Sequence, residues 1–180
     1  TRQSSGLSSL GKVGLTITDA NGCSAKASTV DVNVFSVPTL AVTAASSTSI
    51  CQGESVTLQA SGGFSSYAWS SGATNQNLIV NAAGSYSVTG TTSDGCTTTS
   101  SAQSVTVNAL PTAIVTNNGA SLLCSGLTTT LSASIGMTYL WSNGDTTQTI
   151  TISTSGSYDV TVTNTSGCSA TSGSTLITTS

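Results

Sequence analysis

Apolar and polar residues alternate along most of the chain, in short runs separated by turn residues. Val56, Leu58 and Ala60 share one face of an extended segment, and Leu131 and Ala133 do the same further along. Successive side chains of a β-strand point to opposite faces of a sheet, so this alternation predicts half-buried strands. The short length of each run favours many small strands over a few long elements.

The stretch from Pro38 to Asn108 shows this organisation most completely. Ser93-Asp94-Gly95 is a hairpin signal inside it. Further strands are expected around residues 40–42, 54–60, 67–69, 78–80, 84–88 and 96–107. About seven short strands with turns between them predict an all-β fold of the Ig-like β-sandwich type.

The same landmarks recur about 72 residues later, which indicates tandem repeats. Tyr139 and Trp141 stand where Tyr67 and Trp69 stood, and Tyr158 takes the place of Tyr86. The five cysteines keep the same interval: Cys23 to Cys96 and Cys51 to Cys124 are 73 residues apart, and Cys96 to Cys168 is 72. We therefore expect an array of small domains.

Three domains are predicted from this periodicity. Residues 37–109 and 110–180 form two complete repeats, and residues 1–36 form the C-terminal part of an incomplete one. Two interpretations of the incomplete repeat stay open: the chain is part of a longer protein, or a neighbouring molecule supplies the missing strands. Truncation is the preferred interpretation, because an incomplete sandwich exposes aggregation-prone strand edges.

Composition removes several classes of function. Three residues are basic and six acidic, which gives a net charge of −3 and a pI near 4.2. Nucleic-acid binding is excluded, because it requires cationic side chains that displace phosphate counterions. No apolar run approaches the length of a spanning helix, so membrane insertion is not expected. With no histidine and with scattered acids, no catalytic residues and no cofactor are predicted, and the chain is expected not to be an enzyme.

The cysteines are predicted to form disulfides, which implies an oxidising compartment. Cys51 and Cys96 are 45 residues apart and Cys124 and Cys168 are 44, a spacing that favours one bridge within each complete repeat. Cys23 would then pair with a cysteine upstream of the chain. A zinc site is the competing interpretation, but the CxxC-like clusters typical of zinc are absent from the sequence, so no metal is expected.

Several stretches resemble the Ig-like or PKD-like repeats of large secreted surface proteins of Bacteroidota-type bacteria, including gliding-motility adhesins. The resemblance is carried by Ile50–Leu58, Tyr67–Thr74, Gly84–Thr89, Tyr139–Gln148 and Leu15–Cys23, and it extends over nearly the whole chain. It implies an extracellular segment at the bacterial cell surface, exported by the type IX route.

Several aromatic and polar side chains have both a functional and a structural interpretation. Trp69, Trp141, Tyr86 and Tyr158 are expected to form the core, although the tryptophans, with Tyr67 and Tyr139, also suggest a sugar-stacking platform. Two residues are candidates for glycosylation: Asn164 lies in an N-linked sequon and Thr146 in an O-glycosylation motif. Four aspartates near turns are expected to form those turns, with calcium binding as the alternative: Asp19, Asp94, Asp145 and Asp159.

The favoured function is a non-catalytic structural and adhesive module, a stalk segment of a secreted surface protein. Its partners would be neighbouring repeats of the same parent chain. The alternatives are a segment of a surface filament, held by contacts between copies, and an accessory region of a secreted polysaccharide hydrolase that contacts glycans. The apolar joints at 34–38 and 107–111 favour limited bending between repeats.

Overall fold

A computed structural model describes residues 11–32 and 34–180, and in this part of the chain every regular element is a β-strand. The all-β, Ig-like sandwich class is therefore confirmed. Residues 1–10 and 33 of the predicted incomplete repeat lie outside the described residues. No described helix is long and apolar enough to cross a bilayer. The predicted repeat boundaries and the number of repeats stay predictions.

The chain divides into two compact units. The first holds the described residues of Thr1–Val42, with Ala60–Gln76 and Ser87–Ala102. The second holds Thr43–Gln59, Asn77–Tyr86 and Gln103–Ser180.

The first unit contains two antiparallel strand pairs and one three-stranded sheet. β1 (Gly11–Val13) pairs with β4 (Val30–Val32), and β2 (Thr16–Thr18) with β3 (Ser24–Lys26). The sheet has the order β12-β11-β8, from Thr97–Thr99, Val88–Thr91 and Ser66–Trp69. Trp69 and Val88, which pair across it, are both buried.

Two three-stranded sheets begin the second unit. One has the order β5-β7-β9, formed by Val42–Ala44, Val56–Ala60 and Asn77–Val80. The other has the order β10-β13-β6, formed by Gly84–Tyr86, Gln103–Asn108 and Ser49–Cys51. β6 runs parallel to β13, and this register sets Cys51 beside Asn108.

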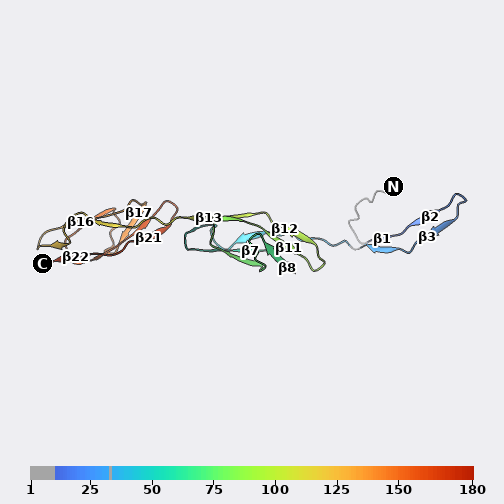
Figure 1. Ribbon diagram of the computed structural model, residues 1–180, viewed down its shortest axis with the longest axis horizontal. Helices are drawn as coiled ribbons and strands as arrows, with labels where there is room; N and C mark the ends of the chain where they lie inside the picture. The colour runs from blue at the N-terminus through green and yellow to red at the C-terminus, as the bar shows by residue number, and fades with distance from the viewer. Residues whose placement is uncertain (1–10, 33) are drawn as a thin grey trace. The chain divides into compact units, whose positions relative to one another are not determined.

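The rest of the second unit is a complete sandwich, drawn in yellow to red in Figure 1. We call it the C-terminal sandwich. One sheet is β14-β16-β18, from Val115–Asn117, Thr129–Ala133 and Thr149–Ile152. The facing strands form the sheets β15-β22-β19 (Leu122–Leu123, Thr175–Thr179, Gly156–Tyr158) and β17-β20-β21 (Thr138–Trp141, Val160–Thr163, Ser169–Thr171). Short interruptions in two long strands, between β19 and β20 and between β21 and β22, separate these two sheets.

The core of the C-terminal sandwich follows the alternation in the sequence. Leu131 and Ile150 come from β14-β16-β18, and Trp141, Val160 and Ile177 come from the two facing sheets. All are at least nine-tenths buried. Burial of such side chains stabilises a fold by roughly 1.5–3 kcal/mol each. Along β16 and β18 the alternation predicts which face of the strand turns inward.

The strand pairings recur along the chain with the same order. β5-β7-β9 corresponds to β14-β16-β18, β10-β13-β6 to β19-β22-β15, and β12-β11-β8 to β21-β20-β17. The parallel pairs also share one register, because Ile50 lies opposite Val107 as Leu123 lies opposite Thr179. The sequence interval of about 72 residues is therefore a structural interval as well.

Candidate functional site

The disulfide of the structure joins Cys51 to Cys168, which are 117 residues apart in the sequence. Their Cα atoms are 5.6 Å apart, within the usual range for a disulfide. The predicted bridges Cys51–Cys96 and Cys124–Cys168 are therefore wrong, and so is the expectation of one bridge inside each complete repeat. Cys23, Cys96 and Cys124 are free; the proposed upstream partner of Cys23 stays a prediction.

Strand direction explains why Cys124 and Cys168 do not meet. Cys124 follows β15 directly, and the N–H of Ser180 donates to the carbonyl of Leu123, so Cys124 lies at the C-terminal end of β22. Cys168 precedes β21, and the chain runs extended from there through β22 (Figure 1). At about 3.3 Å per residue, the chain from Cys168 to Ser180, beside Cys124, spans up to about 40 Å, so the two cysteines lie at opposite ends of the C-terminal sandwich.

Cys168 belongs to a tight turn that occurs three times in the chain. We call it the cysteine hairpin and define it as 19–23, 92–96 and 164–168. In each copy the N–H of the first residue donates to the cysteine carbonyl, and the cysteine N–H donates to a side-chain oxygen of that first residue: Asp19, Thr92 or Asn164. The glycine before each cysteine has a φ of 80–85°. That left-handed conformation is accessible to glycine without steric cost.

Cys51 represents a second type, which we call the strand-end cysteine; the other is Cys124. The N–H of Gln52 donates to the carbonyl of Asn108, at 2.8 Å, so the residues around Cys51 continue the β6–β13 pairing. The carboxylate of Glu54 accepts from the Cys51 N–H at 2.9 Å, and the Glu54 N–H donates back to the Cys51 carbonyl. These bonds fix the backbone of Cys51 at the end of β6.

We call the contact between the hairpin 164–168 and the strand-end Cys51 the joint. It contains a hydrogen bond besides the disulfide. The side-chain N–H of Asn164 donates to the carbonyl of Ala109 at 2.9 Å, so the hairpin contacts the segment that leads from β13 into the C-terminal sandwich. Cys168 is 1% exposed. A covalent bond and a hydrogen bond therefore connect the hairpin to the end of the β6–β13 pair, which limits bending at residues 109–111.

The aromatic side chains occupy structural positions. Trp69, Trp141 and Tyr158 are buried, while Tyr86 is half-buried. Each indole N–H donates 2.8 Å to a backbone carbonyl six residues on, so neither ring offers a face or a donor to a ligand. The tyrosine hydroxyls donate to carbonyls four residues earlier, an arrangement related to the tyrosine corner of Ig domains. A sugar-stacking platform built on Trp69 and Trp141 is therefore contradicted by their burial.

The candidate modification sites differ in their accessibility. Thr146 is exposed. Asn164 is half-buried, and its side-chain nitrogen, the atom that an N-linked glycan would occupy, is the donor to Ala109. Glycosylation of Asn164 would thus attach a sugar to an atom that the joint uses.

The turn aspartates also have structural roles. Asp19 accepts the N–H groups of Asn21 and Cys23 within its hairpin, and Asp145 accepts from the Asn143 amide. Among residues 11–32 and 34–180, no three His, Cys, Asp or Glu side chains gather in a manner that suits a metal ion.

An apolar groove lies on β1 and β4, in the stretch predicted to be an incomplete repeat. Val13, Leu15, Val30 and Val32 line it, together with the small residues between them, around a volume of 520 Å³. Val13, Leu15 and Val30 are each about half exposed or more. In the C-terminal sandwich the corresponding strands, β19 and β22, carry the buried residues Tyr158 and Ile177.

No known protein-family description and no curated protein matches the chain. Solved structures that resemble it include murine CEACAM1b, at 12% identity and a TM-score of 0.39, covering 79% of this chain and all of that one. The fibronectin(III)-like modules of Clostridium thermocellum CbhA match at 13% and 0.39, over 77% of this chain and 94% of theirs. The amphioxus IgVJ-C2 molecule matches at 18% and 0.34, over 72% and 99%.

The similarity is to Ig-like and fibronectin-type proteins, and it indicates no function for this chain. The strand pairings of the chain itself show its fold. The feature that sequence reasoning missed is the Cys51–Cys168 joint. The periodicity could have pointed to it, because equal intervals between cysteines are compatible with a bond from one repeat to the next as well as with a bond inside each.

Proposed function

We propose that the chain is a non-catalytic stalk segment of a large secreted bacterial surface protein, in which tandem sandwiches hold an adhesive region away from the cell. The single observation that carries this proposal is the Cys51–Cys168 bond. A disulfide implies an oxidising compartment outside the cytosol. Its position at a joint between sandwiches, rather than inside a core, suits a rod that must resist bending.

The bond also changes how tension passes through the chain. When the two ends are pulled, force enters β6 at Cys51 and leaves at Cys168 through the sulfur atoms, so the 117 residues between them cannot lengthen. Fully extended, that segment would span about 400 Å at 3.3–3.6 Å per residue. In a stalk built in this way, the bridged segment adds no length even after its β-sheets have unfolded.

Single-molecule force spectroscopy of the full chain, tethered at its ends, tests this role. We expect the oxidised chain to unfold without releasing the bridged segment and the reduced chain to gain about 400 Å of contour length. The Cys124→Ser variant is the matched control, since it removes a thiol outside the bridge. An oxidised chain that extends to its full length would refute the stalk role. Antibody labelling of intact producing cells tests the surface location, and labelling only after lysis would refute it.

A second candidate is a segment of a surface filament, and the apolar groove of the incomplete repeat favours it. Strands from a neighbouring copy that packed on Val13, Leu15 and Val30 would cover that face and link one chain to the next. Negative-stain images separate the two candidates: isolated rods support the stalk, and ordered polymers support the filament.

A further inference from the structure

Cys124 occupies the same structural position as the bridged Cys51. The residue just before β6 and the residue just before β15 accept equivalent hydrogen bonds. The Thr106 N–H donates to the Thr48 carbonyl, and the Thr178 N–H donates to the Ser121 carbonyl, both at 2.8 Å. The turn that follows is also shared. The N–H three residues on donates to the cysteine carbonyl in both copies, and the glycine two residues after each cysteine has a φ of 93° or 85°.

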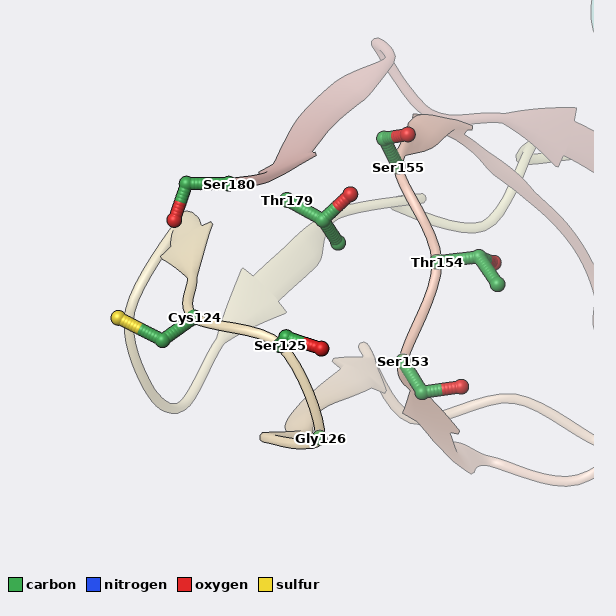
Figure 2. A pocket seen from close by; sticks show the side chains of 8 residues that line it. All are labelled: Cys124, Ser125, Gly126, Ser153, Thr154, Ser155, Thr179 and Ser180. Atoms are coloured by element: carbon green, nitrogen blue, oxygen red, sulfur yellow. The ribbon is translucent and has the colours of Figure 1, made fainter.

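Unlike Cys51, Cys124 is unbonded and exposed. Figure 2 shows its thiol directed outward from the loop, on the side away from Ser153–Ser155. Beside it lies a groove of 270 Å³ that contains Ser125, Thr154 and Thr179. Small polar side chains of this type donate and accept hydrogen bonds with a backbone turn. The end of the C-terminal sandwich therefore presents an exposed thiol on a loop that also lines a polar groove.

Cysteine hairpins whose cysteine is unbonded are also present in the chain. The hairpins that contain Cys23 and Cys96 reproduce the hydrogen bonds and the glycine conformation of the hairpin that contains Cys168. Both of these cysteines are free; Cys23 is exposed and Cys96 is half-buried. The structure thus contains one completed joint, one unbonded strand-end cysteine and two unbonded cysteine hairpins.

We propose that Cys124 is a covalent docking site for the cysteine hairpin of a second copy of this chain, at Cys23 or Cys96, in the geometry of the Cys51–Cys168 joint. The bond is directional, because it joins a strand end to a hairpin and never two parts of the same kind. The inference goes beyond the stalk role and does not depend on it, since it rests only on the equivalence of the two strand ends and the three hairpins.

The chemistry requires a disulfide oxidant, for which we name oxidised glutathione. The Cys124 thiolate attacks one of its sulfur atoms and releases the first glutathione thiolate. The hairpin thiolate then attacks the Cys124 sulfur of this mixed disulfide and releases the second. Two protein thiols become one disulfide, one glutathione disulfide becomes two glutathione thiols, and the two protons pass to the released thiolates.

The test is equilibration of the full chain in a glutathione redox buffer, followed by nonreducing electrophoresis and mass mapping of cross-linked peptides. We expect linked copies in which Cys124 is bonded to Cys23 or Cys96, in clear excess over Cys124–Cys124 and Cys23–Cys23 bonds. The Cys51–Cys168 peptide pair in the same digest shows that the internal joint has stayed intact.

A shifted thiol supplies the matched control. In the double variant Cys124→Ser, Ser125→Cys the thiol moves one residue along the same exposed loop. We expect this variant to form linked copies at least about tenfold less, because a disulfide tolerates only ~4.4–6.8 Å between Cα atoms. Both positions are exposed, so neither substitution threatens the fold.

Three results would overturn the proposal. They are bonds mainly between identical cysteines, Cys124 found only as a free thiol or a glutathione adduct, and equal linkage by the shifted thiol. None of these would bear on the force measurement, which reports on Cys51 and Cys168 alone.

Discussion

Breaking the Cys51–Cys168 bond should strongly destabilise the C-terminal sandwich. The cleanest perturbation is Cys51→Ser, because Cys51 is half-buried and tolerates a polar replacement, whereas Cys168 is 1% exposed and would bury a new hydroxyl. Reduction of the native chain gives the same break without any substitution. If Cys51→Ser and reduction lower the stability by the same amount, the loss comes from the bond and not from the substitution.

The expected magnitude follows from the loop that the bond closes. With the whole chain unfolded, the loop is the 117 residues from Cys51 to Cys168, and chain entropy assigns it about 5 kcal/mol. If the β6–β13 pair stays folded, Cys51 remains beside Asn108 and the effective loop falls to about 60 residues, which still gives about 4 kcal/mol. The cost depends on the logarithm of loop length, so either route of unfolding predicts nearly the same loss.

Urea denaturation followed by tryptophan fluorescence measures this loss. With an m-value of about 2 kcal/mol/M, 4 kcal/mol lowers the midpoint by about 2 M. Trp141 reports on the C-terminal sandwich, because it is buried in the core there. Cys124→Ser serves as the control and should leave the midpoint unchanged. A Cys51→Ser variant that unfolds at the native midpoint, or a control that loses as much, would refute the argument that the joint stabilises the sandwich.

Two further predictions concern the core and the hairpin. Trp141→Ala should lower the free energy of unfolding by about 3–5 kcal/mol, because it removes the largest fully buried side chain. Its control, Leu140→Ala at an exposed position, should lower it by less than about 0.5 kcal/mol. Equal urea midpoints for the two variants would contradict a core role for the tryptophan. Gly167→Ala should cost roughly 1–2 kcal/mol, since its φ of 80° strains any side chain, and Gly173→Ala, where a Cβ meets open space, should be close to neutral in the same assay.

Much of the fold was predictable from local sequence. Alternation at Val56, Leu58 and Ala60 predicts a strand with one buried face, and the structure has β7 there with these three residues buried. The turn Ser93-Asp94-Gly95 predicts a hairpin, and it connects β11 to β12. Such features depend on side-chain periodicity and backbone preference over a few residues, and both can be read without knowledge of the rest of the chain.

The disulfide pairing was decided by the tertiary structure. Sequence spacing suggested that Cys124 and Cys168 meet, but two strand directions keep them apart: β15 runs parallel to β22, and β22 continues β21 away from the hairpin. Cys168 reaches Cys51 because its hairpin lies against Ala109, at the end of the β6–β13 pair. A cross-link requires two Cα atoms within a few ångströms. That distance depends on the direction of the strands and on where one sandwich ends, and the sequence spacing of the cysteines does not determine it.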